Sequence, residues 1–229
     1  MQKLSLIIPA AGSGVRLGSD IPKPFIEIGG KTILEITLSR FIHLPNLIQV
    51  VVACSVELQP KVQQLKSSLP EKVEFVVVKG GDERQVSIYN ALHKVSDEAE
   101  IVAIHDAVRP FIKTTLIQNC CKVASEVGGA VIGIPAKDTI KKVDKTGKVT
   151  ATPNRSDLWQ AQTPQIFRKK ILIEAYRSAM DSGFMGTDDA SLVENVGGLV
   201  QMVKGDQENF KITYPIDLEM AKLILAKES

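Results

Sequence analysis

The residues of this chain that are best suited to chemistry lie in a glycine-rich loop near the N-terminus. The apolar run Leu4–Pro9 predicts a buried strand, and the loop Ala10–Lys23 that follows it has the sequence AAGSGVRLGSDIPK. Glycine has no Cβ, so its backbone can adopt positive φ and several N–H groups can converge on an anion. The loop also carries two cations, Arg16 and Lys23. Both features suit a triphosphate better than a neutral ligand.

Two common phosphate-binding loops do not match this segment. The dinucleotide fingerprint G-x-G-x-x-G needs a third glycine one place earlier than the spacing Gly12, Gly14, Gly18 provides. It also needs an acidic residue at the tip of the next strand, which here ends at Ala53-Cys54-Ser55. The P-loop needs Gly-Lys-Ser/Thr at its end, and this loop lacks it. The alternative for this loop is a tight strand-to-helix turn, which Arg16, Pro22 and Lys23 at short range disfavour, but the loop alone does not decide its function.

Two further polar clusters follow predicted strands. Gly80-Gly81-Asp82 comes after Val73–Val78, and His105-Asp106 comes at the end of Ile101–His105. Ligands of open parallel sheets bind at the carboxyl ends of the strands, so we expect both clusters beside the glycine loop. The Asp106 carboxylate can face a ligand or Mg²⁺ there. His105 is expected to be a hydrogen-bonded strand-end residue and not a general base.

The composition narrows the possible functions. The chain has 229 residues, of which 44% are hydrophobic and 24% charged, as in ordinary globular proteins. A net charge of +2 predicts no nucleic-acid partner and no membrane surface as a partner. No apolar stretch approaches the roughly 20 residues that span a bilayer, and the N-terminus lacks the pattern of a signal peptide. The three cysteines have no metal-ligand spacing, so we expect a reduced, cytoplasmic protein.

Apolar runs alternate with amphipathic segments along the chain. The expected strands are Leu4–Pro9, Ile48–Cys54, Val73–Val78, Ile101–His105, Ala130–Pro135, Leu199–Val203 and Phe210–Thr213. The expected helices are Thr32–His43, Leu58–Leu69, Glu83–Val95, Thr114–Val127, Lys169–Ser182, Asp188–Asn195 and a last one from Pro215. This alternation predicts an α/β fold with a mainly parallel sheet and helices on both faces.

Residues 137–155 depart from this pattern and form what we call the β-arm. Asp138–Val143 and Lys148–Thr152 alternate with a period of about two residues, as strands do. Asp144–Gly147 between them has the composition of a turn. A hairpin of this kind is too thin to form its own core, so it must pack on its own domain or reach another chain. We expect one domain over residues 1–229, with the β-arm as an insertion.

Eight segments along the chain match one family in order: Ala10–Lys23, Gly80–Arg84, His105–Pro110, Asp138–Lys141, Arg155, Leu158–Gln165, Gly186–Ser191 and Asn209–Thr213. Taken together, they resemble the cytidylyltransferases that act on 2-C-methyl-D-erythritol 4-phosphate in the non-mevalonate isoprenoid pathway. The resemblance runs over essentially the whole chain, which makes it more specific than any single motif. It implies a Rossmann-like fold of the nucleotide-diphospho-sugar transferase type. One departure is Pro24, where the family commonly has glutamine.

The resemblance implies roles for particular residues. Arg16 and Lys23 would stabilise charge in the transition state, which suits a forked guanidinium and a compact ammonium group. The nucleotide would lie against Ala10, Ala11, Gly12 and Gly14, and its cytosine against Gly81, Asp82 and Ser87. The polyol phosphate would be held by Arg109, Thr139, Arg155, Thr187 and Lys211. Asp106 would help to position the substrates and to hold Mg²⁺, which is bound mainly through the CTP phosphates.

The expected function is therefore transfer of a cytidylyl group from CTP to 2-C-methyl-D-erythritol 4-phosphate, in a homodimer whose subunits exchange β-arms. The alternative is a ribitol 5-phosphate cytidylyltransferase, which shares the sequence of His105–Pro110. Ala10-Ala11-Gly12, Lys141 and Thr187–Ala190 favour the first possibility. A nicotinamide-dependent oxidoreductase is disfavoured by the late third glycine. A non-catalytic nucleotide-binding module would not need both loop cations and a second anion cluster.

Overall fold

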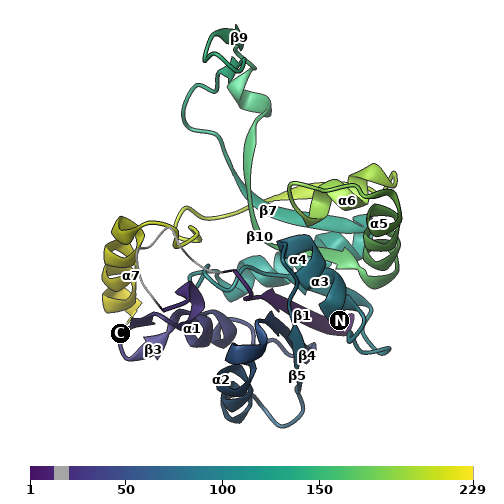
Figure 1. Ribbon diagram of the computed structural model, residues 1–229, viewed down its shortest axis with the longest axis vertical. Coiled ribbons are helices and arrows are strands. Elements are labelled where there is room, and N and C mark those ends of the chain that lie inside the picture. The colour runs from purple at the N-terminus through teal and green to yellow at the C-terminus, as the bar shows by residue number, and fades with distance from the viewer. Residues whose placement is uncertain (13–20, 229) are drawn as a thin grey trace.

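The computed structural model describes residues 1–12 and 21–228, and its centre is a seven-stranded sheet (Figure 1). The strands are β1 (Leu4–Pro9), β4 (Leu47–Cys54), β5 (Glu74–Lys79), β6 (Ile101–Ile104), β7 (Gly129–Pro135), β10 (Trp159–Arg168) and β11 (Val200–Lys204). Their spatial order is β11-β7-β10-β6-β1-β4-β5. All neighbouring pairs are parallel except those of β10, which runs antiparallel to β6 and β7. The predicted mainly parallel sheet is confirmed.

Helices cover both faces of this sheet, as the sequence predicts. On one face, α1 (Ile33–Ser39), α2 (Gln59–Gln64) and α4 (Thr114–Val127) share a core with side chains such as Leu6 and Ile8. On the other, α3 (Arg84–Leu92), α5 (Lys169–Ser182) and α6 (Asp189–Asn195) share a core with Ile7. Successive strand side chains point to opposite faces, so β1 contributes to both cores. None of the helices in the described ranges is long and apolar enough to cross a bilayer.

The last helix, α7 (Pro215–Glu228), packs at the edge of the molecule against α1. A third cluster of buried apolar residues joins Ala221 of α7 to Ile33 and Ile36 of α1 and to Ile212 in the segment before α7. This cluster holds Ile212, and Asn209 donates to the Thr163 carbonyl of β10 (2.8 Å), so the segment before α7 lies beside the sheet. Figure 1 shows α7 beside the short hairpin of β2 (Glu27–Ile28) and β3 (Lys31–Thr32).

Several predicted helices are shorter in the structure. The helix expected to reach His43 ends at Ser39, because the N–H groups of Arg40 and Phe41 bond to carbonyls three residues back and tighten the last turn. Its start is well defined, since Thr32 and Glu35 form a reciprocal capping box. The helix expected over Leu58–Leu69 is the α-helix α2 between two 3-10 turns.

The sequence-based prediction missed one strand and placed one strand that does not form. The ten-residue strand β10 was not predicted, because Gln160, Gln162, Thr163 and Gln165 interrupt its apolar pattern. Conversely, residues 210–213, all of them described, form no strand. This segment is held by single contacts instead, such as the hydrogen bond from Ile212 N to the Val108 carbonyl (2.9 Å).

The β-arm stands away from the sheet between β7 and β10 (Figure 1). Its paired part is shorter than predicted and consists of β8 (Lys142–Val143) and β9 (Val149–Ala151). The predicted turn is confirmed: the Asp144 carboxylate accepts hydrogen bonds from the N–H groups of Thr146 (2.9 Å) and Lys148 (3.1 Å). Val143 and Val149 are 51% and 52% exposed, so the arm presents apolar side chains that its own chain does not cover.

Candidate active site

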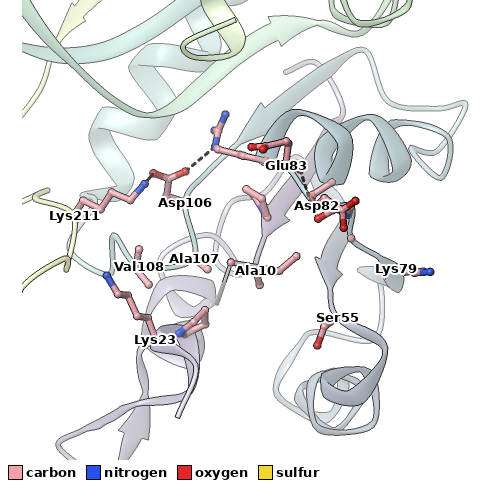
Figure 2. A pocket seen from close by; sticks show the side chains of 18 of the residues that line it. Ala10, Lys23, Ser55, Lys79, Asp82, Glu83, Asp106, Ala107, Val108 and Lys211 are labelled. Atoms are coloured by element: carbon pink, nitrogen blue, oxygen red, sulfur yellow. Dashed lines mark hydrogen bonds and ion pairs between the residues drawn. The ribbon is translucent and has the colours of Figure 1, made fainter. Parts of the chain in front are cut away.

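A cavity of about 810 Å³ lies at the carboxyl ends of β1, β4, β5 and β6. Figure 2 shows Lys23 and Lys211 on one side of it, Asp82 and Lys79 on the other, and Ala10 between them. The predicted site residues that line it are Ala10, Ala11, Gly12, Lys23, Gly81, Asp82, Ser87, Asp106 and Lys211. The three polar clusters expected at one sheet edge therefore do meet there, as the rule for open α/β sheets requires.

The loop after β1 and the turn after β5 are both tied to the end of β4. Ala10 N donates to the Ala53 carbonyl (2.7 Å), and Gly80 N donates to the Cys54 carbonyl (2.8 Å). The two segments then approach so closely that a Cβ on Gly80 would lie 2.4 Å from the Ala11 Cβ. Gly80 is therefore a glycine for reasons of space, because any side chain there would push the two segments apart.

We expect Gly80→Ala to lower kcat/KM about 100-fold, because the new methyl group must displace the loop that faces the ligand. The variant Ala11→Gly/Gly80→Ala removes the 2.4 Å contact but keeps a tight approach to Ser87 Oγ at 3.1 Å, so it should recover part of that loss, with Ala11→Gly alone as the control. The measurement is pyrophosphate release from a nucleoside triphosphate. Equal activity of Gly80→Ala and the unchanged chain would show that this contact does not shape the site.

Ser87 shapes the turn after β5 from inside α3. Its buried hydroxyl accepts a hydrogen bond from Gly81 N (3.0 Å) and lies 3.1 Å from the Glu83 carbonyl, to which it can donate. These bonds fix the orientation of the Gly81 peptide at the cavity wall. In this structure Ser87 therefore acts on the cavity through Gly81.

Lys23 is buried, with 8% of its surface exposed, although it carries a charge. It begins a 3-10 turn, Lys23–Phe25, and its ammonium group donates to the Thr213 carbonyl at 3.0 Å. Pro24 lies inside this turn, where its fixed φ is compatible with the backbone. The departure at position 24 therefore leaves Lys23 in the cavity wall. Gly14 and Arg16, the other predicted residues of this loop, lie outside the described residues.

Asp106 is the centre of a cluster of cations. Its Oδ2 lies 2.9 Å from Lys211 Nζ and 3.7 Å from Arg109 Nε, and its Oδ1 lies 3.2 Å from Arg84 Nε. Burial opposes ionisation of this carboxyl, but Arg84, Lys211 and Arg109 together hold its pKa well below its usual range. Asp106 is therefore an anion in a region rich in positive charge, which is suited to binding anionic substrates.

His105 is buried and neutral. Burial is the main cause that lowers its pKa, to about 4. Its Nε2 lies 2.9 Å from the Arg109 carbonyl, and its Nδ1 lies 3.1 Å from the Thr163 hydroxyl. That hydroxyl also accepts a hydrogen bond from Asp106 N (3.0 Å). The expectation that His105 is a hydrogen-bonded structural residue is confirmed.

Three residues of this region had no role in the sequence-based prediction. Arg84 donates to both oxygens of Asp189, with distances of 3.0 Å from Nη1 and 2.7 Å from Nη2, and Tyr176 donates its hydroxyl proton to Asp189 as well. Arg84 and Asp189 lie in segments that match the family, so the sequence did offer a signal for these two residues. Tyr176 lies in an ordinary amphipathic helix and gave no signal.

Three predicted site residues lie elsewhere in the described part of the chain. Thr139 and Arg155 are exposed on the β-arm, and Thr187 is exposed before α6. Arg155 donates to the Lys137 carbonyl (2.7 Å) and lines a second cavity of about 840 Å³ at the base of the arm, together with Lys113 and Lys204. Arg109, by contrast, is in the cluster around Asp106, and its Nη1 donates to the Asn209 carbonyl (2.8 Å).

Comparisons with known proteins agree with this geometry. The sequence model of the 2-C-methyl-D-erythritol 4-phosphate cytidylyltransferase family matches residues 4–227. A protein of that name from Clostridioides difficile is 44% identical over 227 residues, covering 98% of this chain and 94% of the relative. One from Caldanaerobacter subterraneus subsp. tengcongensis is 39% identical over 228 residues, covering 98% and 99%.

Solved structures give the same result. The 4-diphosphocytidyl-2C-methyl-D-erythritol synthase of Anaerococcus prevotii is similar with a TM-score of 0.87 and 30% identity, covering 98% of this chain and 96% of that one. The 2-C-methyl-D-erythritol 4-phosphate cytidylyltransferase of Thermus thermophilus has a TM-score of 0.80 and 32% identity, covering 98% and 99%. The match of sequence and fold over nearly the full length shows that the chain belongs to the 2-C-methyl-D-erythritol 4-phosphate cytidylyltransferase family.

Proposed function

We propose that the cavity at the strand ends is where this chain carries out the reaction of its family. In that reaction the phosphate of 2-C-methyl-D-erythritol 4-phosphate attacks the α-phosphorus of CTP, which gives 4-CDP-2-C-methyl-D-erythritol and pyrophosphate. The observation that carries the proposal is the convergence of the Ala10–Gly12 backbone, buried Lys23 and the cations around Asp106 on one cavity. The family match favours this reaction over transfer to ribitol 5-phosphate.

The protein contributes alignment and charge stabilisation. The attacking phosphate oxygen is already an anion, so no general base is required, and neutral, buried His105 does not supply one. Lys23 and Arg16 would stabilise the negative charge that grows on the α-phosphate and on the leaving pyrophosphate. Lys23 suits this role because burial in the cavity wall strengthens its interaction with a phosphate.

The base of the nucleotide would bind at the end of the cavity that is formed by the turn after β5. The peptide groups of Gly81 and Asp82 can read the edge of cytosine while Ser87 holds the turn in place. The loop Ala10–Gly12, continued by Gly14, would lie along the ribose and phosphates. The close approach of Gly80 to Ala11 holds this turn against the loop after β1, so the base and the phosphates of one nucleotide could lie against adjacent segments.

We therefore expect kcat/KM for CTP to exceed that for ATP by at least about 100-fold, since a purine would leave the peptide groups of the Gly81-Asp82 turn unpaired. Initial rates of pyrophosphate release with each nucleotide at a fixed polyol phosphate concentration measure this ratio. Comparable values for CTP and ATP would reject this assignment of the base-binding end.

Asp106 is a carboxylate of the cavity wall that could contribute one oxygen to a Mg²⁺ site if the phosphates of CTP displaced Lys211 from it. Its carboxylate is held ionised at the cavity wall, and Mg²⁺ prefers ionised oxygen ligands. We propose that Mg²⁺ is held mainly by the CTP phosphates with Asp106 as a protein ligand, where it would neutralise phosphate charge. Lys211 and Arg109, beside Asp106, would hold the phosphate of the second substrate.

We further propose that the site is completed by the β-arm of a second subunit. Thr139 and Arg155, which the family resemblance assigns to the polyol phosphate, lie on an arm that projects from its own sheet (Figure 1). Val143 and Val149 on this arm are half-exposed and gain burial if the arm packs on a partner. In such a homodimer each arm would deliver Arg155 to the cavity of the other chain.

The test of the proposed function is pyrophosphate release from CTP with each of two acceptors, 2-C-methyl-D-erythritol 4-phosphate and ribitol 5-phosphate. We expect the first to be used with a kcat/KM at least about 100-fold higher. A preference for ribitol 5-phosphate would contradict the proposal, and so would release that does not depend on either acceptor.

A further inference from the structure

The guanidinium group of Arg84 lies between two carboxylates at the wall of the cavity. On one side Nη1 and Nη2 form a forked ion pair with Asp189, at 3.0 and 2.7 Å. On the other side Nε donates to Asp106 Oδ1 at 3.2 Å. Arg84 therefore joins a buried structural carboxylate to the carboxylate that faces the substrates.

The ion pair of Arg84 with Asp189 is held in place by burial and by further hydrogen bonds. Asp189 is fully buried, and Tyr176, which is 1% exposed, donates its hydroxyl proton to Asp189 Oδ1. Asp189 opens α6, whose start is fixed by the capping box between Asp188 and Ser191. The anchor of Arg84 is thus built from α5 and α6, which cover the same face of the sheet as α3.

The contact of Arg84 with Asp106 fixes the orientation of the Asp106 carboxylate. Its Oδ1 is occupied by Arg84 Nε, which leaves Oδ2 to face Lys211 Nζ at 2.9 Å. The backbone of Asp106 is held separately, by its N–H bond to the Thr163 hydroxyl. Both the backbone and one carboxylate oxygen of Asp106 are therefore fixed in the protein without substrates.

We propose that Asp189 and Tyr176 are positioning residues for cytidylyl transfer, because they hold Arg84 in the wall and so keep Asp106 Oδ2 turned toward Lys211. The inference rests on the proposed function of this cavity and assigns two residues outside it. Neither Asp189 nor Tyr176 lines the cavity in the part of the chain that the structure describes.

The physical reason is competition for Arg84. A guanidinium group binds two phosphate oxygens as readily as it binds a carboxylate. Arg84 lines a cavity for a triphosphate, and its side chain is 34% exposed. If Asp189 did not hold it, Arg84 could turn toward the phosphates of CTP or of released pyrophosphate. Such binding would stabilise the ground state and the product, which slows turnover.

The experiment compares Asp189→Asn and Tyr176→Phe with the unchanged chain, measuring kcat, KM for CTP and the inhibition constant of added pyrophosphate. For Asp189→Asn we expect kcat to fall about 30-fold and pyrophosphate to inhibit about tenfold more strongly, because Arg84 loses its forked partner. For Tyr176→Phe, which keeps the ring, we expect both effects in the same direction at about three- to fivefold. The matched controls are Asp181→Asn and Tyr89→Phe, which make the same changes outside this cluster.

Combination with Arg84→Gln separates positioning from a purely structural role. If Asp189 and Tyr176 act through Arg84, adding either change to Arg84→Gln should not strengthen pyrophosphate inhibition further. A fall in kcat with an unchanged inhibition constant in both single variants would overturn the inference, as would constants equal to those of the unchanged chain. Should Asp189→Asn fail to fold, Tyr176→Phe alone decides by the same two constants. Failure of the proposed function is a separate result, since the unchanged chain would then release no pyrophosphate.

Discussion

The variant Lys23→Ala is expected to lower kcat by about 100-fold or more while KM for CTP changes only a few-fold. Removal of one group that stabilises transition-state charge costs on the order of 3 kcal/mol. Lys23 is placed for this role because it is buried in the cavity wall, with its ammonium group fixed by the Thr213 carbonyl. Steady-state kinetics of pyrophosphate release, with CTP varied at saturating acceptor, measure both constants.

The control for Lys23→Ala is Lys31→Ala, which removes an exposed lysine from β3, outside the cavity. The control should keep its activity, and thermal melting should show that both variants are folded. Turnover of Lys23→Ala within a few-fold of the unchanged chain would rule out a catalytic role for this residue.

Mixing two inactive variants is expected to restore activity. Chains carrying Lys23→Ala and chains carrying Arg155→Ala should each be inactive alone. In a mixed dimer with exchanged arms, the cavity that keeps Lys23 receives Arg155 from the other chain and is complete. Random mixing of equal amounts should then give about a quarter of the normal activity, since half of the dimers are mixed and each has one complete site. The measurement is activity after subunit exchange, with the mixed dimer identified by its mass.

The control for the mixing experiment is the double variant Lys23→Ala/Arg155→Ala mixed with the unchanged chain. If arms are exchanged, the mixed dimer has one cavity without Lys23 and one without Arg155, so neither cavity is active. Mixing should then lower the activity below the average of the activities of the unchanged chain and the double variant. If Arg155 serves its own chain, the first mixture stays inactive and the second keeps one complete site per mixed dimer. That pair of results would contradict arm exchange.

Much of the fold could be predicted because the strands at its centre are continuous apolar runs. Leu4–Pro9 and the strand through Val50–Val52 are buried on both faces, and their composition alone indicates this. The antiparallel strand β10 could not be found in that way, since glutamines and Pro164 interrupt its apolar pattern and Gln162 and Gln165 are held by specific tertiary hydrogen bonds. One such contact is the bond from Gln165 Nε2 to the Asp188 carboxylate (2.8 Å).

The site was predictable to a similar extent and for a related reason. Gly81, Asp82 and Asp106 directly follow strands, so sheet topology alone places them at the same edge. The grouping of Arg84, Arg109 and Lys211 around Asp106 depends on how separate loops pack, which no local pattern encodes. Tyr176 illustrates the limit most clearly, because its neighbours in the sequence are those of any amphipathic helix.

The most direct test of the account is a crystal structure of the protein with CTP and Mg²⁺. We predict that cytosine lies against the Gly81-Asp82 turn and that Lys23 contacts the α-phosphate. The ion should lie on the phosphates within reach of Asp106. The contradicting result would be CTP bound elsewhere, for example in the second cavity beside Lys113 and Lys204, with the cavity at the strand ends free of nucleotide.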